Sequence, residues 1–377
     1  MRAAPIFPRY RTATPPAPRR WLAAGSLLTL LAGGGTTLLR GADTDNGSVI
    51  LVMLIAMMFA GFVWLCRVVY YRCSVHHTAT WERGVEREQR LWWEEHQRRF
   101  ALSEVVLIGP AGNTASDWIR VLTREQQPPA EQQETQGVAL RIARTFSEDV
   151  AAREQQLARL LVLQWKKECH RAAVPLMQCF WQGSDAAWLA FCAQMKTSFP
   201  DIVLPASPEP WCGETSLSLI ADLLSSPEND RWCLVAGCQS LPTSSERLRP
   251  AGESAVLWLV GSAGPVMISR GEVFDLSPSG SLAEVCERAQ AQSALDAAPD
   301  ACILFSHPQR PELAGSGWNV THHLQDRYWG ELGNMEPLVV ISLAAMLAQH
   351  HEHPCGWIAT DPQHTLALGI VKPHGNG

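Results

Sequence analysis

Two long apolar segments near the N-terminus constrain this chain more than any other feature of its sequence. Residues 21–39 contain 19 residues without a charge, and residues 49–66 contain 18 more. Because an α-helix rises 1.5 Å per residue, each segment is about long enough to cross a ~30 Å hydrocarbon layer. The residues between them permit only a tight turn. We therefore expect a transmembrane hairpin over residues 21–66, and a cleaved signal peptide is the alternative for the first segment.

Arginines flank these segments unevenly. The turn carries one Arg and two Asp residues, whereas the outer flanks carry Arg2, Arg9, Arg11, Arg19, Arg20, Arg67 and Arg72. The positive-inside bias places both ends of the hairpin in the cytoplasm. The 11 Cys residues, an odd number without framework spacing, favour a reducing compartment. We expect a two-span protein of a bacterial inner membrane, with residues 1–20 and everything after residue 66 in the cytoplasm.

The remaining sequence is typical of a folded domain. The chain is 46% hydrophobic and 18% charged, as in globular proteins. Its net charge of -6 and its scattered basic residues argue against a nucleic-acid partner, which needs clustered Lys and Arg. Residues 67–100 predict a charged juxtamembrane helix, with Glu and Arg at helical spacing in 81–100. This helix spaces residues 101–377 from the bilayer, or it binds a partner.

Residues 101–377 alternate between strand and helix patterns. Apolar runs predict strands at 105–108, 232–236, 255–260, 265–269, 301–305, 357–360 and 366–371. Helical periodicity and apolar stripes predict helices at 147–170, 214–225, 281–295 and 336–349. Residues 126–136 are polar and contain prolines, which predicts a surface loop. The alternation predicts a layered α/β domain, with a doubly wound Rossmann-type sheet as the alternative.

Three segments within residues 200–377 carry a family resemblance. The first is PWCGETSLSL at 210–219, which leads through a helix to LVAGCQS at 234–240. The second is PAGESAVLWL at 250–259, and the third is YWGELGNM at 328–335, before an apolar helix. In their order and spacing these segments resemble the β-ketoacyl synthases. The resemblance implies a thiolase-like layered α/β/α domain behind the hairpin, truncated in its first half because few residues precede this region.

The resemblance also implies where chemistry would take place. The family has a nucleophilic cysteine at a helix start, which Cys212 matches, with basic nitrogens beside it. The family's Gly-His pair reads Gly330-Glu331 here, and its His-Gly-Thr-Gly-Thr segment is absent, with His307 as a loose substitute. We therefore expect Cys212, His307 and Glu331 to be vestigial, and the fold to be retained without catalysis.

One histidine-rich segment is a candidate for a metal site. His350, His351, His353 and Cys355 offer ligands within six residues, but consecutive ligands on one short loop rarely close a tetrahedron around zinc. We therefore expect a polar loop and no metal there. The lysine of a phosphate-binding loop is missing after Gly109, and no G-x-S-x-G serine motif occurs. We expect no cofactor.

The layout of the whole chain resembles accessory membrane proteins of the bacterial type VI secretion system, in particular the adapters that help to load lipase effectors. The features that carry this resemblance are the membrane hairpin, the helix rich in Arg, Glu and Trp, and the thiolase-like domain. The resemblance implies a protein partner, either an effector or a component of the apparatus. The sequence thus predicts a membrane-tethered, non-catalytic adapter. The alternative is an active thiolase-like acyl-transfer enzyme that uses Cys212.

Overall fold

A computed structural model describes residues 5–40, 46–168, 175–225, 231–275, 281–306, 311–361 and 363–375. The chain divides into two compact units, Arg2–Trp93 and Glu94–Gly377. We call the first the helical unit and the second the α/β unit.

The helical unit contains the two apolar segments. They lie in α1 (Pro18–Arg40) and α2 (Asn46–His96), and both helices are long and apolar enough to cross a membrane. The helices approach closely where residues are small, since a Cβ on Gly25 would lie 3.5 Å from the Cβ of Ala60. Most of the predicted turn, residues 41–45, lies outside the described residues.

The charged helix predicted within residues 67–100 is not a separate element. α2 runs for 51 residues without a break, so the second apolar segment and the Glu/Arg-rich segment form one helix. It ends at His96, and Arg99 already begins a strand. The i, i+4 spacing of Glu and Arg supports the helix beyond the apolar segment, so nothing in the sequence breaks it.

The α/β unit is built on a large twisted sheet. Its strands are β1 (Arg99–Ile108), β4 (Leu176–Gln182), β5 (Glu209–Pro210), β6 (Trp232–Ser240), β7 (Glu253–Gly261), β8 (Val266–Ser269), β9 (Glu272–Phe274), β10 (Ala301–Leu304), β11 (His323–Leu324), β12 (Cys355–Thr360) and β13 (Leu366–Pro373). A separate hairpin, β2 (Gln132–Glu134) with β3 (Gly137–Ala139), lies across the end of the predicted 126–136 loop. The sheet thus contains every strand that the apolar runs predict.

The sheet is an internal duplication. The first half has the order β5-β4-β6-β7-β1, and the second half has the order β11-β10-β12-β13-β8. Corresponding pairs also share their direction: the two outer pairs of each half are parallel and the two inner pairs are antiparallel. β1 and β8 join the halves as an antiparallel pair. The first half therefore begins at Arg99 and is as complete as the second, so the expected truncation of the first half is not present.

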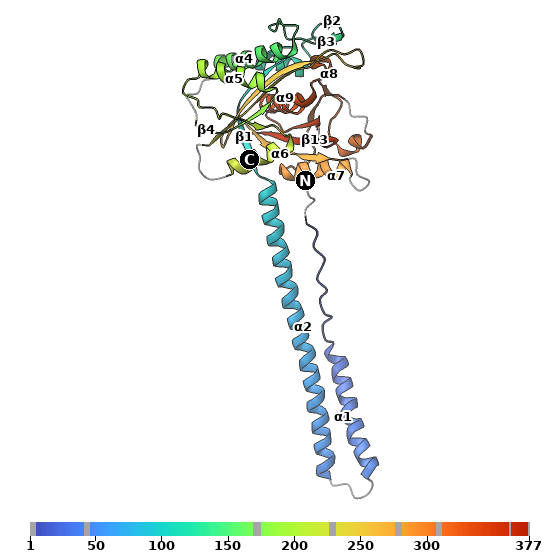
Figure 1. Cartoon of the computed structure of the whole chain (residues 1–377). Helices are drawn as coiled ribbons and strands as arrows, with labels where there is room; N and C mark the ends of the chain where they lie inside the picture. Colours follow the sequence, from blue (N-terminus) through green and yellow to red (C-terminus); the bar gives the residue numbers. More distant parts are fainter. Residues whose placement is uncertain are drawn as a thin grey trace. The chain divides into compact units, whose positions relative to one another are not determined.

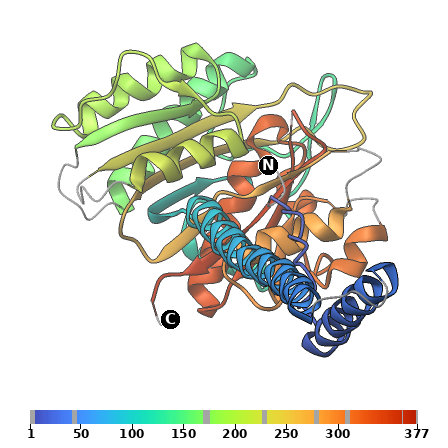
Figure 2. The ribbon, with the colours of Figure 1, turned by 90° about the horizontal axis from the view of Figure 1, so that it is seen from below.

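Helices separate and cover the two halves of the sheet. α3 (Ala115–Leu122), α6 (Glu214–Leu224) and α9 (Glu336–His351) share one hydrophobic core with residues from both halves. α4 (Val150–Glu168) and α5 (Asp185–Ser198) cover the outer face of the first half, and α7 (Leu282–Gln292) covers that of the second. Figures 1 and 2 show α4 and α5 on one side of the unit and α7 on the other. The layers are therefore α/β/α/β/α.

The sequence patterns explain these positions. α9 is apolar on all sides, and its residues from Glu336 to Ala348 are buried, as expected for a helix inside a core. α4 alternates apolar and polar faces and covers the sheet from outside. The βα unit of β4 and α5 was not predicted, because Gln178 and Gln182 interrupt the apolar run of the strand.

Candidate functional site

Two helices of the central layer, α6 and α9, begin beside one pocket. Its volume is about 160 Å³, and it is lined by Gln182, Trp211, Cys212, Gly213, Asn334, Pro337, Asp361 and Gln363. Gly213 is the N-cap of α6, and Pro337 is the second residue of α9. Gln182 ends β4, and Asp361 follows β12. The pocket therefore joins the two halves of the duplicated fold.

Cys212 differs from the other cysteines of the α/β unit. Its side chain is exposed, and its backbone N–H donates to the Ser216 Oγ at 2.8 Å, which ties the residue to the first turn of α6. Burial raises the pKa of the Cys233 thiol to about 12 and those of Cys192 and Cys286 to about 11. Burial also raises the thiol pKa at the other described positions of the unit, Cys179, Cys238, Cys302 and Cys355. Among the described thiols of this unit, Cys212 is the one that solvent reaches freely.

The sharp turn into α6 is made by the residue after Cys212. Gly213 has φ 57° and ψ −125°, a conformation that L side chains rarely adopt. A Cβ at this position would lie 2.7 Å from the Asp361 Oδ2. The Asp361 Oδ1 accepts the backbone N–H groups of Gln363 and His364, both at 2.9 Å, so the carboxylate is held in place. The turn therefore requires glycine, and it presents Cys212 and Asp361 to the same pocket.

Asn334 lies in the pocket where the sequence suggested Glu331. Glu331 forms an ion pair with Arg247 at 2.9 Å, and its backbone pairs with the segment around Ala251. Gly333, which has φ 53°, then turns the chain so that Asn334 lines the pocket just before α9. The sequence signal that could have identified Asn334 as a pocket residue is the pair Gly333-Asn334 directly before an apolar helix.

α6 and α9 each carry an acid in the first turn, half-buried at Glu214 and buried at Glu336. Burial raises the pKa of Glu214 at the start of α6 and that of Glu336 at the start of α9. The carboxylate of Glu336 accepts the backbone N–H of Thr360 at 2.8 Å, which fixes the end of β12 against α9. This contact positions the loop that carries Asp361.

The remaining predicted site residues that the structure describes do not join the pocket. His307 lies outside the described residues. His350 and His351 end α9, and the His353 Nδ1 contacts the His351 carbonyl at 2.7 Å. Cys355 is buried in β12. In the part of the chain that the structure describes, no group of three or more His, Cys, Asp or Glu residues is placed to hold a metal ion.

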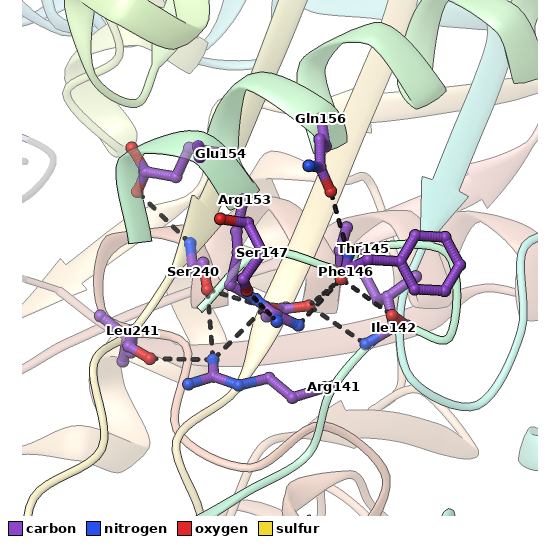
Figure 3. Close-up of polar contacts among 12 residues, drawn as sticks. Arg141, Ile142, Thr145, Phe146, Ser147, Arg153, Glu154, Gln156, Ser240 and Leu241 are labelled. Atoms are coloured by element: carbon purple, nitrogen blue, oxygen red, sulfur yellow. Dashed lines mark hydrogen bonds and ion pairs between the residues drawn. The ribbon is translucent and has the colours of Figure 1, made fainter. Parts of the chain in front are cut away.

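A second polar centre lies at the ends of β6 and β7. The fully buried Glu253 carboxylate accepts from the Arg153 Nε, the Arg141 Nη1 at 3.4 Å and the Ser240 Oγ at 2.8 Å. It also accepts the Ile142 N–H and the Thr145 hydroxyl, each at 3.1 Å. Figure 3 shows Arg153 of α4 beside Arg141, which reaches Ser240 and Leu241. We call this group the Glu253 cluster, and it ties the 140–147 segment to the sheet.

Comparisons with known proteins agree with this architecture. No family model matches the chain, and no curated protein matches its sequence. Among solved structures, it is similar to the ishigamide ketosynthase/chain length factor, with a TM-score of 0.51 and 13% identity over 74% of this chain and 100% of the other. It is also similar to the ketosynthase from module 6 of the bacillaene synthase of Bacillus subtilis 168, with a TM-score of 0.50 and 10% identity over 74% and 72% of the two chains. The fold is thiolase-like.

These neighbours correct the function expected from the sequence. Both are named as ketosynthases. The prediction of a non-catalytic adapter is therefore contradicted, and the enzyme alternative agrees better with the thiolase-like neighbours. The resemblance to type VI secretion proteins has no support among these comparisons, and the protein partner that it implied stays a prediction.

Proposed function

We propose that this chain is a membrane-anchored acyl-transfer enzyme in which the Cys212 thiol accepts an acyl group from a thioester. The observation that carries the proposal is the position of Cys212, an exposed thiol in a pocket where two central helices begin. The positive ends of helix dipoles stabilise a thiolate and the oxyanion that forms when it attacks a carbonyl.

The reaction has two balanced steps. In the first, the Cys212 sulfur attacks the thioester carbonyl, the bond between the carbonyl carbon and the donor sulfur breaks, and the donor leaves as a thiol with the proton that Cys212 released. In the second, an acceptor nucleophile attacks the acyl-cysteine, the new carbon–sulfur bond breaks, and Cys212 regains a proton from the acceptor. Asp361 is the carboxylate at the pocket that is able to take the acceptor's proton.

The side chains of the pocket favour acyl transfer over decarboxylative condensation. None of its eight lining residues is a histidine or another basic residue. The amides of Gln182 and Asn334 are able to donate hydrogen bonds to a carbonyl oxygen, as in other sites that stabilise an oxyanion. Transfer of an acyl group between nucleophiles needs no basic nitrogen of the kind that serves decarboxylation.

Intact-mass spectrometry tests this function directly. The full chain, purified in mild detergent, is incubated with acetyl-CoA, and we expect the mass to rise by one acyl group. Cys212→Ser should remain unmodified, whereas Cys192→Ser, which removes a half-buried thiol, should be acylated like the wild type. The proposal fails if no acyl-CoA modifies the wild type or if Cys212→Ser gains the same mass.

The membrane anchor is the second part of the proposal. The flanking arginines support a hairpin with both ends in the cytoplasm of a bacterium, and the α/β unit on that side of the inner membrane. Alkaline phosphatase fused after residue 100 should then be inactive. High activity of this fusion would overturn the orientation.

A further inference from the structure

The pocket beside Cys212 is too small for a long acyl chain. Its volume of about 160 Å³ is close to that of a cavity that holds benzene, ~150 Å³, and below the ~300 Å³ at which pockets for drug-sized ligands begin. Trp211 packs edge-to-face on Trp258, with ring centroids 5.6 Å apart. Trp258 is fully buried, and its indole N–H donates to the Ser342 Oγ at 2.7 Å. Firmly packed side chains therefore stand behind Trp211.

The polar lining of the pocket points to an acyl group that forms hydrogen bonds. Gln182, Asn334 and Gln363 line it with amides, and no side-chain hydrogen bond within the described residues engages these amides. Trp211 is only 6% exposed, and its indole N–H has no acceptor in the described parts of the chain. A buried donor without an acceptor costs about 1–3 kcal/mol. Solvent does not reach this indole N–H, so the open amides are the groups that an oxygen on the bound acyl group would meet.

The charge of the pocket disfavours an acidic acyl group. The Asp361 carboxylate is fixed by two backbone N–H groups and faces the turn at Gly213. Among the described residues that line the pocket there is no Lys or Arg. A second carboxylate would therefore enter next to a like charge without a cation to offset it.

We infer that this pocket selects a short, uncharged acyl group that carries a hydrogen-bond-accepting oxygen, and that it excludes long alkyl chains and acyl groups with a carboxylate. This inference rests on the proposed acyl transfer through Cys212. Trp211, Gln363 and Asp361 are then the residues that determine specificity, the first by length, the second by hydrogen bonding and the third by charge.

The rate at which Cys212 is acylated, followed by intact mass, tests this selection in the full chain. The probes are the CoA thioesters of 3-hydroxybutyrate, butyrate, octanoate and malonate. We expect the 3-hydroxybutyryl group to load about 10-fold faster than butyryl, the effect of one hydrogen bond, and octanoyl and malonyl to load more slowly than either. Gln363→Leu should remove the preference for the hydroxyl group, and Asp361→Asn should raise the ratio of malonyl to 3-hydroxybutyryl loading.

The outcomes separate this inference from the proposed function. If no probe modifies Cys212, acyl transfer itself fails. If octanoyl or malonyl loads as fast as 3-hydroxybutyryl, Cys212 is an acyl acceptor but the proposed selection is wrong. If the hydroxyl preference survives in Gln363→Leu, this amide is not the group that recognises the oxygen, and the assignment of Gln363 is overturned.

Discussion

The Cys212 pocket and the Glu253 cluster are both rich in polar side chains, yet they are built in opposite ways. In the Glu253 cluster the carboxylate is fully buried and receives two guanidinium groups, two hydroxyls and a backbone N–H. In the pocket, Cys212 is exposed, and the Trp211 indole has no acceptor among the described residues. A polar group satisfied by its own chain holds structure together, whereas one left open is available to a ligand.

Glu253→Gln should cause the largest loss of stability. The substitution keeps the shape of the side chain but leaves Arg153 buried without its carboxylate, which costs about 3–5 kcal/mol in buried ion pairs, whereas Arg141 keeps its ion pair with Glu134 at 2.7 Å. Urea unfolding of the full chain, followed by tryptophan fluorescence, measures the loss. The exposed Glu246→Gln is the matched control and should stay within about 0.5 kcal/mol of the wild type. A loss below about 1 kcal/mol for Glu253→Gln would mean that the cluster is not structural.

Gly213→Ala should have the next largest effect on stability. It forces a side chain into a positive φ and brings a Cβ within 2.7 Å of the Asp361 Oδ2, so we expect a loss of about 1–3 kcal/mol. Gly315→Ala is the control, because a Cβ there meets no atom within 4 Å. The double variant with Asp361→Ala should recover the part of the loss that comes from the contact. Equal unfolding midpoints for Gly213→Ala and Gly315→Ala would contradict the strained turn.

Glu336 should make stability depend on pH in an acidic window. Burial raises its pKa above the ordinary value of 4.5, so the folded chain binds this proton more tightly than the unfolded chain. Its contribution to stability is then fully present below about pH 4.5 and is lost as the pH rises through the raised folded pKa. Urea midpoints of wild type and Glu336→Gln, compared on both sides of this window, should show a larger fall in the wild type, because Glu214, whose pKa is also raised, contributes a fall to both. The exposed Glu148→Gln should fall as much as the wild type, and an equally large fall in Glu336→Gln would assign the whole effect to other groups.

Cys212→Ser should change stability least, by less than about 0.5 kcal/mol, because its side chain is exposed. It should nevertheless abolish rapid labelling of residue 212 by iodoacetamide, mapped by peptide mass spectrometry because Cys66 and Cys73 are also exposed. Cys233→Ser is the contrasting variant, since it places a hydroxyl in the buried strand β6 and should cost about 1–3 kcal/mol. If Cys212→Ser destabilises the chain as much as Cys233→Ser does, the thiol belongs to the core and not to a site.

The sequence by itself determined the local elements of this protein. Uncharged apolar runs predicted the two long helices, and short apolar runs predicted the strands from 232 to 371 that the structure confirms. Such patterns can be read locally, because the residues that a helix or strand buries recur at regular spacing along the chain. The order of three segments was also enough to predict the thiolase-like fold, although it missed the first half of the duplication, where β4 contains two glutamines.

Only the tertiary structure decided which residues share the pocket. Gln182 and Asp361 belong to different halves of the sheet, and they meet because the duplication brings the ends of β4 and β12 to the starts of α6 and α9. The segment around Glu331 pairs with the segment around Ala251, and this pairing puts Asn334 in the pocket instead of Glu331. Such contacts depend on strand register and turn geometry between distant segments, and a local pattern carries no information about either.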